Sequence, residues 1–138
     1  MPNDPLTQDD ISIEAIQAVF EQAYMDVKFD EQSGILRINE EILTRAHLCE
    51  SRERLTLLAV YQLKDDSQRI DRLELVNRIN ENYVMIRAGI NDDDDLWFDY
   101  SVVLKGGITA KALVQTTRMF MNLVPKAVGE CDEDGIIE

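Results

Sequence analysis

The sequence predicts an α+β domain in which three helices pack mainly on one face of an antiparallel sheet of about five strands. Apolar residues recur at three- and four-residue steps in three segments, as amphipathic helices require. Between these segments apolar and polar residues alternate, as they do in half-buried strands. Acidic turns and a glycine pair separate the alternating segments. Together these patterns predict the element order α-β-β-β-α-β-β-α.

The first predicted helix follows residues 1–10, a polar segment with little to bury that we expect to be a flexible arm. Ser12 is placed to cap this helix. Its buried side comprises apolar residues at helical spacing, namely Ile13, Ile16, Val19, Phe20, Ala23 and Tyr24.

Strands are predicted next. Residues 27–29 and 35–38 flank a polar turn that contains Gly34, which indicates a hairpin. Residues 42–49 fit a further strand, although the stretch from Glu40 also fits a helical turn. Residues 55–63 are rich in strand-forming residues and alternate clearly, so they predict another strand.

A second helix is predicted from Asp66 or Ser67 to about Tyr83. Residues 84–90 and 96–104 then alternate on either side of an acidic turn, which indicates a long hairpin.

The last predicted helix follows Gly106 and Gly107, which break the strand before it. Thr109 is placed to cap this helix, and Pro125 is expected to end or kink it. The domain is predicted to span residues 11–128, with residues 129–138 as an acidic tail.

The net charge argues against proteins that bind nucleic acids or anionic membranes. The 138 residues include 27 acidic and 14 basic side chains, giving a net charge of -13 that repels phosphate backbones and anionic lipids. Two cysteines do not make a disulfide framework, and no stretch approaches the ~20 apolar residues of a membrane span. We therefore expect a cytoplasmic protein that binds neither nucleic acid nor membrane.

No catalytic, cofactor or metal site is predicted. The run Asp92 to Asp95 offers oxygen ligands, but its spacing differs from that of a calcium-binding loop, which favours a solvated hairpin tip. A metal-dependent enzyme using these aspartates is the alternative, and an acidic decoy for a nucleic-acid-binding protein is a third hypothesis. His47 and Cys49 lie ~7 Å apart on a strand, too far for a nucleophile and its base.

Two helices carry more apolar surface than one sheet face can cover. The second and last predicted helices each have an apolar arc of roughly 220°, about twice the minimum for a helix that faces one core. Uncovered apolar surface usually marks an interface, so these arcs predict a homodimer joined through helices. The candidate interface residues are Leu75, Ile79, Val114, Met119 and Met121.

Several segments resemble the YbjN-like family of small acidic bacterial proteins. They are the helix end at residues 75–80, the acidic tip at residues 91–95, the strand at residues 96–104 and the run Gly106-Gly107-Ile108-Thr109. The family is described as regulating bacterial sensory transduction, and its fold is similar to that of type III secretion chaperones. The resemblance implies a non-enzymatic homodimer that binds a partner protein, without a cofactor and without catalytic residues.

Overall fold

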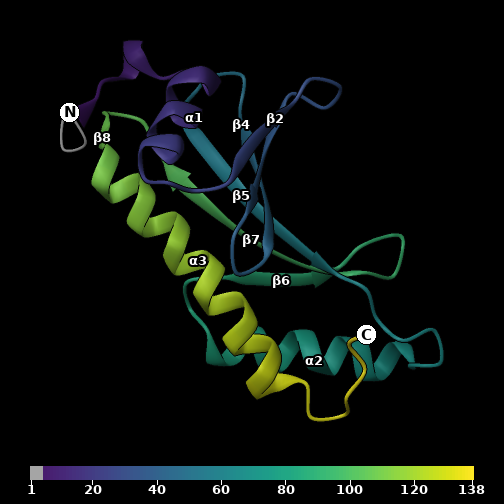
Figure 1. Cartoon of the computed structure of the whole chain (residues 1–138). Helices are drawn as coiled ribbons and strands as arrows, with labels where there is room; N and C mark the ends of the chain where they lie inside the picture. The colour runs from purple at the N-terminus through teal and green to yellow at the C-terminus, as the bar shows by residue number, and fades with distance from the viewer. Residues whose placement is uncertain (1–4) are drawn as a thin grey trace.

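The computed structural model describes residues 5–138 (Figure 1). Six strands form the main antiparallel sheet, β1 and β8 form a separate two-stranded sheet, and the α-helices pack against the main sheet. A short 3-10 helix, η1, precedes the first α-helix. The bounds are β1 Pro5–Leu6, η1 Gln8–Asp10, α1 Ile13–Gln22, β2 Val27–Asp30, β3 Ile35–Asn39, β4 Leu43–Leu48, β5 Arg54–Tyr61, α2 Arg69–Asn82, β6 Arg87–Ile90, β7 Leu96–Val103, β8 Ile108–Thr109 and α3 Ala110–Cys131.

The main sheet of the described chain has six strands in the order β2-β3-β4-β5-β7-β6, and all neighbours are antiparallel. The α+β class is confirmed, with one strand more than the expected five or so. The ambiguous segment after Glu40 supplies β4. Its inward residues are Thr44 and Ala46, both fully buried, and neither is a large apolar residue that would reveal the alternation in the sequence.

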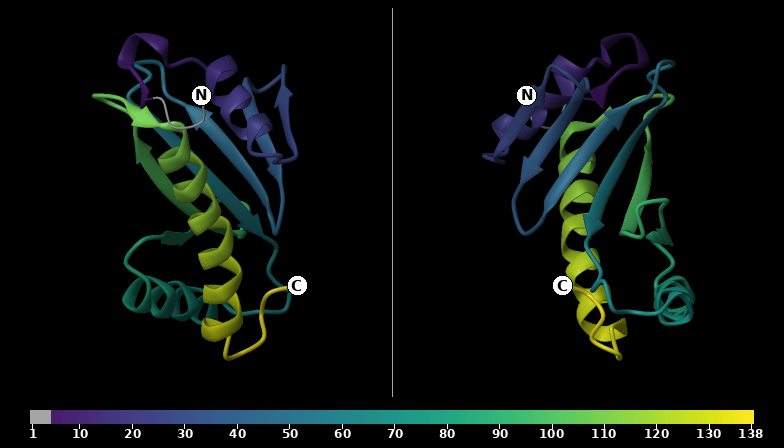
Figure 2. Two further views of the ribbon diagram at one scale, coloured as in Figure 1. Left: turned by 60° about the vertical axis from the view of Figure 1, so that its left-hand side comes forward. Right: turned by 90° about the vertical axis from the view of Figure 1, so that its right-hand side faces the viewer.

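The helices define the layers. Helices α1 and α3 pack on one face of the sheet, with α3 crossing β5 and β7 and α1 lying over β2 and β3. In the left view of Figure 2, α3 lies in front of the strands. The core between these layers contains the inward side chains of every strand of the main sheet, together with Phe20 of α1 and Phe120 of α3.

Helix α2 lies beside the edge strand β6 and contacts α3. Asn80 connects α2 to this edge. Its Oδ1 accepts a hydrogen bond from the Ala88 N–H at 2.9 Å, and its Nδ2 donates to the Ala88 carbonyl at 3.0 Å. The amide side chain thus pairs with backbone groups that the next strand of a sheet would otherwise bind, and α2 protects one sheet edge.

Both predicted caps are confirmed. Ser12 Oγ accepts from the Ala15 N–H, and Thr109 Oγ1 accepts from the Ala112 N–H, each at 3.0 Å. Gly107 is needed just before Thr109 because its φ is +96° and a Cβ there would lie 2.8 Å from the Leu6 carbonyl oxygen. The run after Lys105 is therefore a strand-to-helix connection in contact with β1.

Two boundaries differ from those predicted. Strand β6 begins at Arg87 rather than Val84, which is 97% exposed. Pro125 was expected to end or kink the last helix; α3 does not end there but continues to Cys131. Proline removes one hydrogen bond of the helix, yet Ala127 and Cys131 beyond it are buried, and this packing favours the continued helix.

Segments near both ends of the described chain pair with other parts of the fold. Residues 1–4 lie outside the described residues, but β1 pairs with β8 and Gln8 Nε2 donates to the Arg52 carbonyl at 3.1 Å. At the other end, Ile136 is buried and Ile137 pairs with Leu63. The Asp132 carboxylate accepts from the Ile136 and Ile137 N–H groups, which fixes the turn before this pairing.

Candidate functional site

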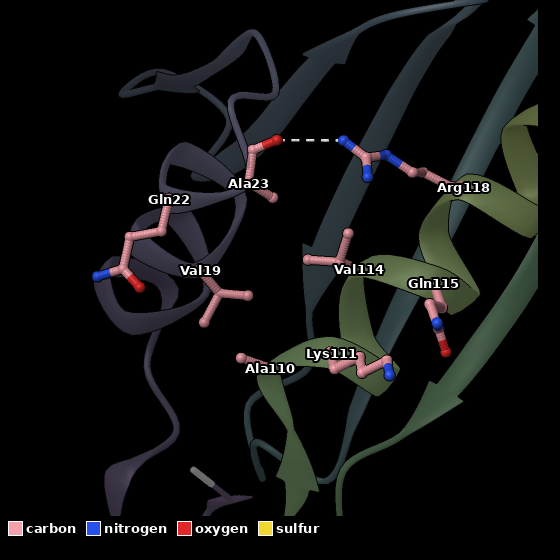
Figure 3. A pocket seen from close by; sticks show the side chains of 8 residues that line it. All are labelled: Val19, Gln22, Ala23, Ala110, Lys111, Val114, Gln115 and Arg118. Atoms are coloured by element: carbon pink, nitrogen blue, oxygen red, sulfur yellow. Dashed lines mark hydrogen bonds between the residues drawn. The ribbon is translucent and has the colours of Figure 1, made fainter. Parts of the chain in front are cut away.

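A groove with an apolar floor lies between α1 and α3 (Figure 3). Its volume is about 260 Å³. Val19 and Val114 approach each other from the two helices, and Ala23 and Ala110 complete the floor. The rim is polar and is formed by Gln22, Lys111, Gln115 and Arg118.

Arg118 closes one end of the groove. Its Nη2 donates a hydrogen bond at 3.1 Å to the carbonyl of Ala23, at the C-terminus of α1, and lies 3.9 Å from Glu40 Oε1. A cation at a helix C-terminus interacts favourably with the free carbonyls there, so this contact also holds α1 against α3. None of the side chains that line the groove is acidic, in contrast to the chain as a whole.

Tyr24 follows Ala23 directly and is 96% exposed. Its φ of +62° lies in the left-handed region, which is unfavourable for a bulky side chain. Exposed aromatic residues are enriched at protein interfaces, and strained backbone gathers at functional sites. At the end of α1, Ala23 lines the groove, and the next residue, Tyr24, exposes almost its entire aromatic side chain to solvent.

The five predicted interface residues separate into two groups. Leu75, Ile79 and Met121 are buried in the core, at 0%, 0% and 1% exposure, so the prediction that they lack cover within one chain is wrong. Their cover comes from the packing of α2 against β6 and α3, which periodicity alone does not reveal. Val114 and Met119 are half-buried, and Val114 forms part of the groove.

The apolar arc of α2 is nevertheless incompletely covered. Ile70 and Leu73 are 58% and 43% exposed, and Val84 and Met85 are exposed just after the helix ends. Ile70 and Leu73 are three residues apart and therefore neighbours on one helix face. We name Ile70 and Leu73, at the start of α2, the apolar stripe; Val84 and Met85 lie beyond the other end of the helix. The exposed apolar surface of α2 is therefore on Ile70 and Leu73 and not on Leu75 and Ile79.

The acidic tip is an ordered turn. Asn91 Oδ1 accepts hydrogen bonds from the N–H groups of Asp93 and Asp95, and Asp94 adopts a φ of +61°. The Asp94 carboxylate lies 3.3 Å from Arg72 Nη1 and 3.8 Å from Arg69 Nη1. These contacts direct one aspartate of the run toward α2.

Carboxylates converge elsewhere among the described residues. Asp71, Glu74 and Asp134 offer oxygen atoms within 4.8 Å of one another. Asp134 also lies 3.7 Å from Arg78 Nη2, so an arginine already partly neutralises the group. Exposed acidic clusters are common without a bound ion, and this one has no further feature of a metal site.

The two cysteines differ in environment. Cys49 Sγ lies 3.2 Å from Ser51 Oγ, and this hydrogen bond is the main reason why the pKa of Cys49 falls to about 7. Burial raises the pKa of the Cys131 thiol. His47 is exposed on β4 and forms no hydrogen bond with Cys49 within the described chain, so a cysteine-histidine nucleophile is not assembled here.

Tyr83 and Glu130 connect the ends of α2 and α3. The Tyr83 hydroxyl donates a hydrogen bond to Glu130 Oε2, and this bond to a carboxylate raises the pKa of Tyr83 to about 12.

No helix within residues 5–138 combines the length and apolar character that crossing a bilayer requires.

Comparison with known proteins identifies the family. Residues 12–133 match the YbjN family, described as "Putative bacterial sensory transduction regulator". The chain belongs to this family. No curated protein matches the sequence.

Solved structures share the fold. Escherichia coli YbjN is similar over 93% of this chain and 96% of its own, with a TM-score of 0.78 and 12% identity. A chain of the HopA1-SchA chaperone-effector complex covers 86% of this chain and 90% of its own, at a TM-score of 0.55 and 15% identity. The Yersinia pestis type III secretion chaperone SycH, in complex with a fragment of YscM2, covers 86% of this chain and 98% of its own. Its TM-score is 0.52 and its sequence identity is 15%. The fold is therefore that of type III secretion chaperones.

Proposed function

We propose that this chain is a non-enzymatic protein-binding module, chaperone-like or regulatory, that works as a homodimer. The α1–α3 groove carries this proposal. An apolar floor with a polar rim is the usual arrangement of a site that receives an apolar side chain while fixing its orientation. Lys111 and Arg118 add hydrogen-bond donors at the rim, and the exposed aromatic residue Tyr24 directly follows Ala23, which lines the groove.

The occupant would be a short segment of another protein. A hollow of about 260 Å³ accommodates one or two side chains rather than a folded domain. The fold neighbours are described in complexes with an effector and with a protein fragment, which agrees with this reading. The family's description as a regulator is compatible with the same kind of site.

The homodimer would use the apolar stripe on α2. This stripe lies on a different helix from the groove, so pairing of two chains through α2 leaves the groove open. In a twofold dimer each stripe would cover its own copy, which removes both from water. Salt screens the repulsion between two chains of charge -13 beyond ~8 Å at physiological ionic strength, so contact burial can outweigh it.

The groove is tested with a variant that changes its floor. Val114→Glu places a carboxylate between the two helices, and the half-buried position lets the charge reach water without unfolding the chain. Asn122→Glu adds the same charge to an exposed position of α3 outside the groove and is the matched control.

Tagged wild type and both variants are used to purify bound proteins from the native cell. A partner recovered by wild type and by Asn122→Glu is then purified and titrated by calorimetry. We expect Val114→Glu to weaken its binding at least tenfold. If every recovered protein binds Val114→Glu as well as wild type, the groove is not the binding site.

A further inference from the structure

The sheet face opposite α1 and α3 carries a line of basic residues. The registers of neighbouring strands place one residue of each strand side by side across the whole sheet. In sheet order this row is Lys28, Arg37, Arg45, Leu58, Asp99 and Arg87. All six belong to the strand positions that alternate with the core residues, so they point away from the helices.

The basic residues at the two ends of this row differ in their ion pairing. Arg87 binds Asp99 through two hydrogen bonds of 3.0 and 2.7 Å and lies over the Trp97 ring at 5.1 Å. Lys28, Arg37 and Arg45 have no carboxylate within 4.0 Å in the described part of the chain. Among the described residues, these three adjacent cations therefore form no ion pair of 4.0 Å or less.

Acidic residues do approach one end of the row. Asp26, Asp30 and Glu31 border shallow hollows together with Lys28 and Arg37. They belong to the edge strand β2 and its flanking turns, whereas Arg45 lies two strands further in. The row itself carries three adjacent cations on β2, β3 and β4, although the whole chain has a net charge of -13.

This arrangement is unfavourable for the isolated chain. Residues directly opposite on neighbouring strands are only ~5 Å apart, and like charges at such positions destabilise a sheet. Arg37 has a cation opposite it on both sides, Lys28 on one and Arg45 on the other. An anionic group placed between them would reverse this repulsion.

The surroundings favour a polypeptide as the anion. Leu58 within the row is partly exposed, as are Leu43 and Val60 beside it, and Val103 is exposed further along the same face. Apolar side chains of a protein segment can pack on these residues, whereas a phosphate backbone offers none.

We propose that the open face of the sheet is a second docking surface, which binds an acidic segment of a partner protein across strands β2, β3 and β4. Carboxylates of the segment pair with Lys28, Arg37 and Arg45, and its apolar residues pack on Leu43 and Leu58. The surface is separated from the α1–α3 groove by the sheet itself. Its occupancy therefore does not depend on the function proposed for that groove.

The test uses a fluorescein-labelled peptide of twelve residues, glutamate with leucine at every third position, in fluorescence anisotropy titrations. The variant Arg37→Gln/Arg45→Gln removes the two central cations. The control Lys64→Gln/Lys126→Gln removes two exposed cations outside the sheet. We expect the first pair to weaken peptide binding at least tenfold and to raise the melting temperature, because the repulsion is gone. The control pair should weaken binding less than twofold.

Three results would overturn the proposal. One is the absence of any peptide binding by wild type at low salt, and another is an equal loss of binding in the control pair. The third is tighter binding of a thymidine oligonucleotide of the same length, which would make the row a nucleic-acid surface. Val114→Glu should leave peptide binding unchanged, so failure of the groove and failure of the sheet face are distinguishable.

Discussion

Cys49 is the residue whose chemistry depends most on one neighbour. The hydrogen bond from Ser51 stabilises the thiolate and lowers the pKa of Cys49 to about 7, so the thiolate fraction rises as pH increases through that value. Burial raises the pKa of Cys131, which keeps that thiol protonated over the same range.

Alkylation by iodoacetamide, followed by mass spectrometry from about pH 5 to pH 9, checks this difference. The rate at Cys49 should reach half of its maximum near pH 7, and Cys131 should react much more slowly. Ser51→Ala should move the Cys49 midpoint to higher pH. Equal rates at the two cysteines would contradict the environments described above.

Two buried threonines on different elements give opposite expectations. Thr44 Oγ1 on β4 has no hydrogen-bond partner among residues 5–138, whereas Thr117 Oγ1 on α3 donates to the Leu113 carbonyl at 2.8 Å. Thr44→Val should raise the free energy of unfolding by about 1 kcal/mol, because a buried unsatisfied hydroxyl is removed. Thr117→Val removes the hydrogen bond to the Leu113 carbonyl and should lower the free energy of unfolding by a similar amount. Urea unfolding measures both, and a destabilised Thr44→Val would show that the hydroxyl has a partner.

Thr44 also explains why the sequence left a helical turn open as an alternative to the strand predicted at residues 42–49. Strands β5 and β7 are readable because large apolar residues occupy their inward positions. In β4 the inward positions are Thr44 and Ala46, which give no such signal. The caps at Ser12 and Thr109 were predictable because a cap depends only on the next few residues.

At the scale of elements, Asn80 is expected to stabilise the contact between α2 and β6. Asn80→Ala removes both hydrogen bonds to Ala88 and leaves the backbone groups of an edge strand unpaired. The free energy of unfolding should fall by about 1–3 kcal/mol. Asn77→Ala is the control, since Asn77 is exposed on the same helix and has no side-chain hydrogen bond in the described structure. Equal denaturation midpoints for the two variants would mean that Asn80 does not secure the edge.

The acidic tip shows a second contact between elements. Asp94→Asn weakens the pair with Arg72 and should destabilise the fold by about 0.5 kcal/mol, as exposed ion pairs do. Asp93→Asn loses the same charge, but the carboxylate has no ion pair among the described residues, so we expect no loss. Thermal melts with and without millimolar calcium or magnesium test the alternative. A clear rise with metal would favour a metal-binding tip.

Helix periodicity indicated how much apolar surface α2 has, but not which part of it is covered. The wide arc correctly indicated excess apolar surface, whereas Leu75 and Ile79 turned out to face the core. Which side faces inward depends on contacts with β6, the next strand along the chain, and with α3, which is distant in the sequence. The basic row was hidden for a similar reason, because Lys28, Arg37 and Arg45 become neighbours only through the strand registers.

At the scale of the whole molecule, two binding faces and one self-association surface are proposed on a chain of 138 residues. The groove, the basic row and the apolar stripe are formed by different elements of the fold, namely α1 and α3, strands β2 to β4, and α2. A homodimer through α2 would therefore present two copies of each binding face. Linked copies bind multivalent partners more tightly than single ones, which suits a chaperone or a regulator.

Sedimentation velocity tests the proposed homodimer most directly. Wild type at micromolar concentration should sediment with twice the 15.8 kDa chain mass. Leu73→Asp, which places a charge in the apolar stripe, should shift it toward the monomer, and Asn122→Asp on α3 should leave it dimeric. A wild type that remains monomeric at every concentration would contradict the homodimer and leave the stripe without the occupant proposed for it.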